Sequence, residues 1–251
     1  MDKEYWEMIA PKYEEEIFDV LQNDASGVIV KAIEKIASPD KTIIDIGCAV
    51  GKWLPVLSPL FKRVIAADIS IKNLEIAKEK HVDLQNVEYQ QMDMSADNLT
   101  VMPCDNAVCI NAILTDSLEK RINFFQSLSM CLNEGGNLVL VVPSLESKLY
   151  TNIIADRWNI DNAENEQSPK GSEAIKKILN IKQGVTDIDN VPTKHYLKEE
   201  LLLLLKLEGF ETIQIHKINY KWATEFHDSP EWLKDPYPWD WMCTAKKITT
   251  Q

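Results

Sequence analysis

The sequence predicts an α/β fold on a mostly parallel sheet, because short strand-like runs alternate with helical stretches through its middle. The runs are KTIIDI at 41–46, RVIAADI at 63–69, NVEYQQM at 86–92, CDNAVCI at 104–110 and GNLVLVV at 136–142. Strands joined through helices lie parallel to each other. With 251 residues, 45% of them hydrophobic, the chain can fill the core of one large domain.

Two stretches between these runs have the apolar spacing of helices. In 71–80, Ile71, Leu74 and Ala77 share one face, and Ser70 is placed to cap the first turn. The stretch that follows the fourth run carries a second apolar stripe. Its members are Leu118, Ile122, Phe125, Leu128 and Leu132. We expect both stripes to face the core.

The end of the chain is expected to add a helix and two strands. Gly209 follows the apolar helix KEELLLLLKLEG, as glycine often does at helix ends, and Gly135 and Gly136 are assigned the same structural role. ETIQIHKI at 211–218 and WDWMCTAKK at 239–247 read as strands. The link between them, about twenty residues rich in proline and aromatics, is too long for a tight hairpin.

Two regions depart from the alternating pattern. The first forty residues are predicted to form one or two helices, with a break at Pro11. Two polar, breaker-rich links, 159–171 and 182–193, flank the short helical run SEAIKKILN. The predicted division is an N-terminal helical lid at 1–40, a core at 41–142, an insert or substrate lid at 143–193, and a closing helix with the last two strands at 194–251.

Composition disfavours several classes of function. The five cysteines form no CxxC pair and the four histidines show no HxxxH or HExxH spacing, so no metal is expected. A net charge of −12 disfavours nucleic acid as a partner. The longest apolar runs are LVLVV and LLLLL, far too short for a bilayer, so no membrane partner is expected and a cytoplasmic location is the default.

The turn after the first predicted strand is the most informative segment. Two of the eight glycines, Gly47 and Gly51, lie within five residues there, where they let backbone N–H groups approach a ligand at a helix start. The dinucleotide fingerprint wants glycines at the positions of Gly47, Ala49 and Lys52, and two of the three fail. The pattern from Asp45 to Gly51, acidic-x-Gly-x-small-x-Gly, instead resembles the first motif of the class I S-adenosylmethionine-dependent methyltransferases.

This resemblance implies a binding site for S-adenosylmethionine at the ends of successive strands. Asp68 matches the family's carboxylate that accepts from both ribose hydroxyls, and Ile69 matches the apolar residue under the adenine. Asp93 and Met94 resemble the pair that meets the adenine edge, and Asn111 matches the position facing the methionine part. Plainer explanations stay open: a helix cap for the first carboxylate, and strand-end turns for the second and for the asparagine.

In this family a mobile N-terminal helix often closes over the cofactor, which makes Tyr13 the expected lid residue. The family commonly has glycine where this chain has Ala49, whose methyl group would crowd the ribose or methionine. The residues expected at the cofactor are Tyr13, Asp45, Gly47, Cys48, Ala49, Gly51, Asp68, Ile69, Asp93, Met94 and Asn111.

The resemblance covers residues 41–142 and extends to the final strands. It implies a Rossmann-like, doubly wound, mostly parallel seven-stranded sheet with an antiparallel last strand and helices on both faces. The implied activity is in-line methyl transfer to a small molecule. The alternatives are a non-catalytic protein that binds S-adenosylmethionine or S-adenosylhomocysteine and, less favoured, a nicotinamide-dependent dehydrogenase.

No catalytic residue follows from the motifs, and no oligomeric state is predicted. If the acceptor must lose a proton, His195, His227 and Asp116 are candidate bases. Aromatic residues near both ends of the chain are candidates for the wall of a substrate cavity. They are Tyr5, Trp6, Tyr13, Trp222, Phe226, Trp232, Tyr237 and Trp239.

Overall fold

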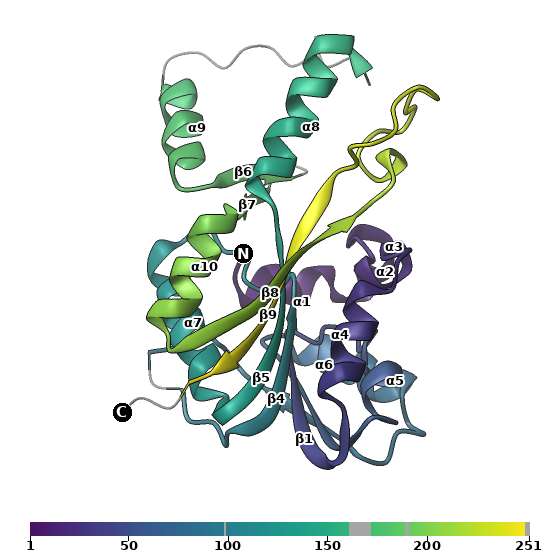
Figure 1. The fold of residues 1–251 in the computed structure, drawn as a ribbon, viewed down its shortest axis with the longest axis vertical. Coiled ribbons are helices and arrows are strands. Elements are labelled where there is room, and N and C mark those ends of the chain that lie inside the picture. Colours follow the sequence, from purple (N-terminus) through teal and green to yellow (C-terminus); the bar gives the residue numbers. More distant parts are fainter. Residues whose placement is uncertain (98, 161–171, 189–190, 249–251) are drawn as a thin grey trace.

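The computed structural model describes residues 1–97, 99–160, 172–188 and 191–248. Its main sheet has seven strands in the order β3-β2-β1-β4-β5-β9-β8, in which β9 runs antiparallel to both neighbours (Figure 1). In chain order the strands are β1 (Ser38–Ile46), β2 (Phe61–Asp68), β3 (Val87–Gln91), β4 (Cys104–Ile110), β5 (Leu132–Pro143), β8 (Phe210–Asn219) and β9 (Trp239–Lys247). All seven predicted strands are present, and the predicted fold class is confirmed.

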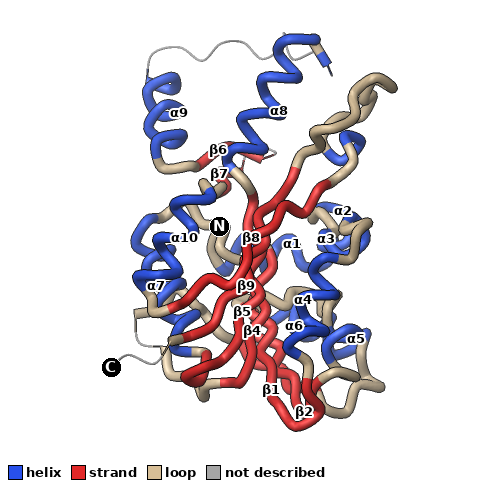
Figure 2. Tube along the Cα trace, viewed as in Figure 1, coloured by secondary structure: helices blue, strands red, loops and turns tan. Residues whose placement is uncertain are grey.

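Helices cover both faces of this sheet (Figures 1 and 2). On one face lie α4 (Val28–Ile36), α5 (Leu54–Leu57) and α6 (Ile71–Lys80); on the other lie α7 (Leu118–Met130) and α10 (Lys198–Leu207). The pleat sends alternate residues of one strand to opposite cores. Ile44 and Ile46 pack with the α7 and α10 side chains, whereas Ile43 packs with α4 and α5.

Three residues of the predicted helical stripes are exposed and do not face the core as predicted. Leu74 and Ala77 are buried, but Ile71 is 43% exposed, because it lies in the first turn of α6 at the rim. In α7, Leu118 and Ile122 are also exposed. The Arg121 guanidinium folds back onto the carbonyls of Thr115 and Asp116 at 3.0 and 2.8 Å, so the buried face is rotated toward Arg121, Phe124, Phe125 and Leu128.

The predicted capping residues have mixed outcomes. The Ser70 hydroxyl caps α6 by accepting from the Asn73 N–H, as expected. Gly209 adopts φ +80° just after α10 ends, also as expected. Gly135, however, does not end a helix. It adopts φ +73° inside β5, in the segment where the register of β5 against β4 shifts.

The N-terminal region is more divided than the one or two predicted helices. It contains α1 (Lys3–Ile9), a 3₁₀ turn (Ala10–Lys12), α2 (Tyr13–Glu16), α3 (Val20–Asn23) and α4. Pro11 lies in the 3₁₀ turn and separates α1 from α2, as predicted. The first strand begins at Ser38, three residues before the predicted start at Lys41.

The insert contains α8 (Leu145–Trp158), α9 (Ser172–Lys182) and a two-stranded sheet of β6 (Val185–Ile188) and β7 (Val191–Lys194). The prediction of an irregular link at 182–193 is therefore wrong, because the β-branched residues of this segment pair across β6 and β7. Most of the other predicted link, 159–171, lies outside the described residues. Figure 1 shows α8 and α9 above the sheet.

The long link between β8 and β9 packs on α8. Trp222 and Phe226 stack with ring centroids 5.5 Å apart, and both join a small apolar cluster with Ile154 and Leu233. None of the described helices has the length and apolar character needed to cross a membrane.

Candidate functional site

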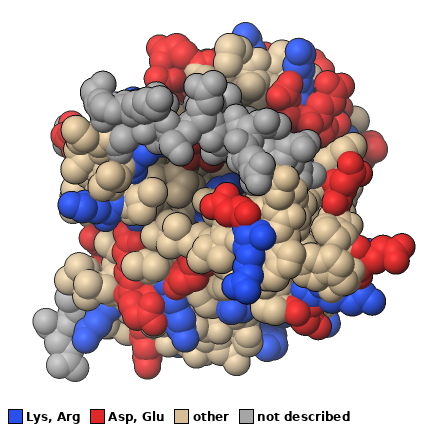
Figure 3. All heavy atoms as spheres, turned by 90° about the horizontal axis from the view of Figure 1, so that it is seen from above, with Lys and Arg blue, Asp and Glu red and all other residues tan. Residues whose placement is uncertain are grey.

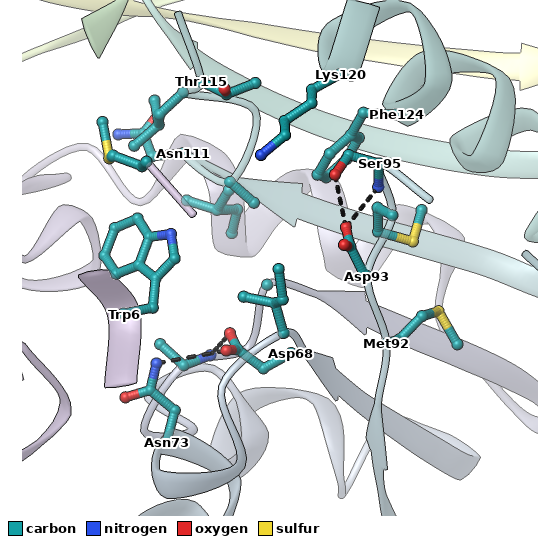
Figure 4. Close-up of a pocket in the computed structure, with 18 of the residues that line it drawn as sticks. Trp6, Asp68, Asn73, Met92, Asp93, Ser95, Asn111, Thr115, Lys120 and Phe124 are labelled. Carbon is teal, nitrogen blue, oxygen red and sulfur yellow. Dashed lines mark hydrogen bonds between the residues drawn. The ribbon is translucent and has the colours of Figure 1, made fainter. Parts of the chain in front are cut away.

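The strand-end residues singled out from the sequence meet around one small cavity of about 100 Å³ (Figure 4). Its wall includes Gly47, Ala49, Asp68, Ile69, Asp93, Met94, Asn111 and Tyr13 from the predicted set. Cys48 lines the larger cavity next to it. Asp45 and Gly51 line neither cavity, so their contribution is to the shape of the turn.

The turn after β1 has left-handed backbone at three alternate positions. Gly47, Ala49 and Gly51 have φ of +74°, +48° and +82°. A Cβ on Gly47 would lie 2.4 Å from the Ala112 Cβ, and one on Gly51 would lie 2.8 Å from the Leu54 side chain. The first glycine therefore permits close approach to the end of β4, and the second permits packing against a helix.

Asp45 is buried beneath this turn. It is 2% exposed, and its Oδ2 has no hydrogen-bond partner among the described residues. Burial, together with the nearby Asp68 carboxylate, raises the pKa of Asp45 to about 7. The protonated carboxyl group is thus stable in the folded chain well above the pH at which it would ionise in water.

This shift predicts a pH-dependent effect of Asp45→Asn. The unfolded chain loses the Asp45 proton near pH 4 and the folded chain only near pH 7, so this group makes the folded state less stable as pH rises between them. We expect the Tm of the variant, relative to that of the wild type, to rise by about 5–10 °C from pH 5 to pH 8, roughly 2.5 kcal/mol. A Tm difference that does not change with pH contradicts this prediction.

The Asp68 carboxylate is held in the cavity wall by hydrogen bonds to both of its oxygens. Its Oδ2 accepts from the Ala49 N–H at 2.9 Å, and its Oδ1 accepts from the Ser70 N–H at 2.8 Å. The Asn73 Nδ2 lies 3.4 Å from the same Oδ1. Burial raises the pKa of Asp68, while these donors oppose the rise. The carboxylate thus holds the turn and the start of α6 together, which is the cap explanation, and still lines the cavity.

Asp93 forms a strand-end turn and also lines the cavity, so both interpretations of this residue agree with the structure. Its Oδ1 accepts from the Ser95 N–H at 2.8 Å and from the Ser95 hydroxyl at 2.6 Å, which is an Asx turn. The same residue lines the cavity together with Met94. In the view of Figure 4, Asp93 and Trp6 lie at opposite ends of the cavity.

Asn111 links the end of β4 to the last strand. It has φ +49°, and its Nδ2 donates to the Asp240 Oδ2 at 2.9 Å. Its Oδ1 is buried and has no partner among the described residues. A polar atom in this state is costly unless a ligand satisfies it.

Several cavity residues had no place in the sequence prediction of the cofactor site. They are Asn73, Met92, Ser95, Thr115, Lys120 and Phe124. Asn73 carried a usable signal, because it is a polar residue beside the apolar stripe in the first turn of α6. It is 1% exposed, and its Oδ1 also lacks a partner in the described part of the chain.

A larger cavity of about 550 Å³ adjoins the first. Both are lined by Trp6, Tyr13, Gly47, Ala49 and Asn111. Further lining residues come from α3, from α8, from the β6–β7 hairpin and from the start of β9.

Four of the eight predicted aromatic wall residues line the larger cavity. They are Tyr5, Trp6, Tyr13 and Trp239. Trp222 and Phe226 are buried in the cluster against α8, with Tyr237 packed beside them. Trp232 is 56% exposed and packs on Trp158.

Of the three candidate bases, His195 lines the larger of these two described cavities, and His227 and Asp116 line neither. It is 4% exposed and follows β7. Its Nδ1 lies 3.0 Å from the Thr193 carbonyl oxygen and 3.1 Å from the Thr186 hydroxyl. Burial lowers the pKa of His195 to about 4, and Lys148 and Lys194 contribute to the decrease.

The fold and the strand-end site define a class I S-adenosylmethionine-dependent methyltransferase. The family model of a methyltransferase domain matches residues 21–215, and the chain belongs to this family. S-adenosylmethionine is therefore its cofactor. The buried, unpartnered amide oxygens of Asn73 and Asn111 at the cavity wall fit a polar ligand of this kind.

Solved structures share the fold. A methyltransferase from Anabaena variabilis has a TM-score of 0.64 at 18% identity, covering 98% of this chain and 94% of that one. The N-methyltransferase NodS of Bradyrhizobium japonicum, in complex with S-adenosyl-L-homocysteine, has a TM-score of 0.62 at 10% identity, covering 98% of each chain.

A curated relative is more similar in sequence over a shorter stretch. The ribosomal protein L11 methyltransferase of Clostridium botulinum is 30% identical over 138 residues. The match covers 48% of this chain and 43% of the relative, so the chain spans less than half the length of the curated relatives it matches.

Proposed function

We propose that this protein transfers a methyl group from S-adenosylmethionine to a small molecule held in the larger cavity. The observation that carries the proposal is that the two cavities share the lining residues Trp6, Tyr13 and Asn111. A ligand in the strand-end cavity thus adjoins a second space, about 550 Å³, within the usual size range of small-molecule sites.

For the cofactor we propose contacts residue by residue. Asp68 accepts from the ribose hydroxyls, Ile69 and Met94 lie at the adenine, and Asp93 accepts from its amino group. The turn from Gly47 to Gly51, with Cys48 and Ala49, and the amide of Asn111 surround the methionine part. Asp45 supports the turn from below. When bound, S-adenosylmethionine supplies a methyl group on a positively charged sulfur, so the chain must chiefly align the acceptor and exclude water.

The cavity walls favour a small acceptor over a protein. The acceptor space is lined by residues of α1, α2 and α3 together with residues of α8 and the β6–β7 hairpin, so it is bordered by several elements. We also propose that nucleic acid is no partner. On the face seen in Figure 3, Lys and Arg side chains are scattered among acidic ones and form no continuous basic stripe.

Within residues 1–40, predicted as a helical lid over a core at 41–142, we propose that α1 and α2 form the part that opens, because α4 packs against the sheet with Ile29 and Ile33 fully buried. The Glu7 carboxylate accepts from the N–H groups of Ile71 and Lys72 at 2.8 and 3.3 Å, at the positive end of α6. Lys80 pairs with Glu14 and Lys52 pairs with Asp19, each at 2.7 Å. Contacts of this partly exposed kind stabilise weakly, so the lid opens at low cost. Residues 143–193 form the second cover, and 194–251 complete the sheet.

S-adenosylhomocysteine binding should therefore slow backbone hydrogen exchange in α1 and α2, because the ligand contacts Trp6 and Tyr13 and holds the lid closed. Mass spectrometry of the exchanged protein with and without the ligand measures this. The β8–α10 pair at the far side of the sheet is the internal control. Unchanged exchange in residues 3–16 removes the lid from the proposal.

Two measurements test the proposed function itself. Calorimetry with S-adenosylhomocysteine reports the cofactor site, and transfer of a labelled methyl group to a small-metabolite extract or to ribosomal protein reports the acceptor class. Labelled metabolites support the proposal, and labelled ribosomal protein refutes the small-molecule part. Binding without transfer to either indicates a non-catalytic protein, and tight NADH binding without S-adenosylhomocysteine binding indicates a dehydrogenase.

We propose His195 as the general base for an acceptor that must lose a proton. The Thr193 carbonyl can only accept, so the Nδ1 at 3.0 Å from it carries the proton and Nε2 has the free lone pair. The lowered pKa of about 4 keeps the imidazole neutral at physiological pH. Because His227 and Asp116 line neither cavity, they are not proposed for this role.

A further inference from the structure

The larger cavity carries more carboxylates than its basic side chains neutralise. Its acidic lining residues are Glu16, Asp19, Glu225 and Asp240, and its basic ones are Lys52 and Lys148. Lys52 already pairs with Asp19 at 2.7 Å. Three carboxylates therefore remain around one cavity with Lys148.

Asp240, at the start of β9, is held by neutral donors in the described structure: two side chains and the backbone N–H of Ser144. Its Oδ2 accepts from the Asn111 Nδ2 and from the Tyr220 hydroxyl, each at 2.9 Å. The side chain is 9% exposed, and burial raises its pKa. Burial and the Asp240 carboxylate together raise the pKa of Tyr220 far above that of a free phenol, so Tyr220 stays a neutral donor. None of these contacts balances the charge of Asp240.

Glu225 reaches the same cavity from the link between β8 and β9. Glu225 is exposed to solvent, yet the protein around it raises its pKa, and the Asp240 carboxylate adds to the rise. Lys148 on α8 acts in the opposite direction. No ion pair joins Lys148 to either carboxylate among the described residues.

Two buried polar atoms that line the same cavity are without a hydrogen-bond partner among the described residues. Thr151, one turn after Lys148 on α8, is 4% exposed and lines the cavity, yet its Oγ1 has no hydrogen-bond partner in the described residues. Trp239, next to Asp240, is 9% exposed, and its Nε1 is equally without a described partner. Buried polar groups normally find partners, so two exceptions in one wall indicate a polar ligand.

We propose that Glu225, Asp240 and Thr151 form an ammonium site that binds a protonated amine carried by the methyl acceptor. A cation placed there compensates the charge of Glu225 and Asp240 and offers the N–H donors that carboxylates and a hydroxyl accept. The inference rests on the proposed function and adds the substrate class: a small amine whose ammonium group is set apart from the atom that is methylated.

The methionine part of the cofactor also carries an ammonium group, and the position of the site distinguishes the two sources. Glu225, Asp240 and Thr151 line the larger cavity and not the strand-end cavity that holds Asp68 and Asp93. Asp240 alone contacts a residue common to both cavities, Asn111. A substitution of Glu225 therefore tests whether the ammonium group belongs to the acceptor or to the cofactor.

The test uses three probes of similar size on the full chain saturated with S-adenosylhomocysteine: benzylammonium, benzyl alcohol and benzoate. Ligand-detected NMR at neutral pH measures their affinities. We expect benzylammonium to bind about tenfold more tightly than the other two, because only it carries the charge the site lacks. Glu225→Gln should remove most of this preference and leave S-adenosylhomocysteine affinity unchanged. The matched control is Glu231→Gln: like Glu225, Glu231 is an exposed carboxylate of the same link, but it lines neither cavity.

Other outcomes overturn the ammonium site in distinguishable ways. Equal binding of the three probes, a preference for benzoate, or no binding of benzylammonium rejects the site while leaving the proposed function intact. If Glu225→Gln weakens S-adenosylhomocysteine and keeps the benzylammonium preference, the carboxylate belongs to the cofactor. If wild type fails to bind S-adenosylhomocysteine at all, the proposed function itself fails.

Discussion

We expect His195→Gln to lower kcat about 100-fold or more, the usual cost of removing a general base, while leaving S-adenosylhomocysteine affinity unchanged. Glutamine retains hydrogen-bonding capacity and comparable size but has no basic nitrogen. Steady-state kinetics with the acceptor found by labelling measures kcat, and calorimetry measures the affinity. A loss confined to KM would show instead that His195 only binds the acceptor.

The position of His195 is fixed from several directions. Its backbone N–H donates to the Gly184 carbonyl at 2.7 Å, and the next backbone N–H, of Tyr196, donates to the Pro143 carbonyl at 2.8 Å. Lys194, one residue before, is 1% exposed and pairs with Glu200 at 2.6 Å. Such a constrained backbone holds the imidazole in one orientation, with Nδ1 on the Thr193 carbonyl.

The pH profile gives a second readout for the same residue. Since the pKa of His195 is lowered to about 4, the base stays unprotonated, and kcat/KM should not fall because of this group between pH 7 and pH 5. A decline is expected only as pH approaches 4. An inflection near pH 6.5 that disappears in His195→Gln would contradict the lowered pKa.

His216→Gln is the matched control for this substitution. His216 lies on β8, is exposed and lines neither cavity. The same chemical change there should leave kcat and its pH profile unaltered. If both variants lose activity equally, the loss reflects general damage and His195 is not the base.

The strands and their ends were predictable because they depend on local pattern. Val64 and Ala66 face one core while Ile65 and Ala67 face the other, so both parities are apolar and the run reads as a buried parallel strand. Asp68 and Asn111 could be singled out for the same reason, since a polar residue ending such a run stands at the edge where ligands bind.

The acceptor side was not predictable in this way. Asn111 and Asp240 are 129 residues apart in sequence, and only the antiparallel pairing of β9 with β5 brings them together. The β6–β7 hairpin was missed because Gly184, Pro192 and several acidic residues look like a loop locally. The sequence alone offered no reason to choose His195 over the other two candidate bases. The β6–β7 hairpin, which it follows, places it at the cavity wall.

The exposed residues at the starts of α6 and α7 show a different limit. The spacing of apolar residues shows which face of a helix is apolar. It does not show at which residue of the helix that face begins to be covered by the sheet. Ile71 and Leu118 are the first residues of their helices and lie beyond the sheet that would cover them. The buried Arg121 had no signal in the sequence, because its partners are backbone carbonyls.

We expect Asp68→Ala to weaken S-adenosylhomocysteine binding by about 1.5–3 kcal/mol, roughly 10- to 150-fold. Each carboxylate oxygen has two acceptor sites, and the Ala49 and Ser70 N–H groups at 2.9 and 2.8 Å occupy one on each. One site on Oδ2 is free, and the second site on Oδ1 meets only the long 3.4 Å contact from the Asn73 Nδ2, so the two ribose hydroxyls can donate to these two sites. Calorimetry of the variant measures the loss, and unaltered affinity refutes this placement of the ribose.

Asp68 also shapes the turn and the start of α6. Weaker S-adenosylhomocysteine binding by Asp68→Ala alone therefore does not show whether the variant has lost a contact with the ribose or has a distorted turn. Asp105→Ala is the matched control. The Asp105 Oδ2 accepts from the N–H and hydroxyl of Thr42 at 2.8 and 3.0 Å, near the amino-terminal ends of β4 and β1 and away from the strand ends that line the cavity. We expect this variant to lose stability and to keep its affinity for S-adenosylhomocysteine.

A ligand modification completes the separation through a double-mutant cycle. An S-adenosylhomocysteine analogue without the ribose 2′-hydroxyl should bind wild type more weakly than the parent ligand but bind Asp68→Ala with the same affinity as the parent. The two changes then share one interaction and their free energies do not add. If they add fully, Asp68 contributes through the shape of the turn at Ala49 and does not bind the ribose, so the carboxylate is only the helix cap that its bonds to Ser70 and Asn73 already show.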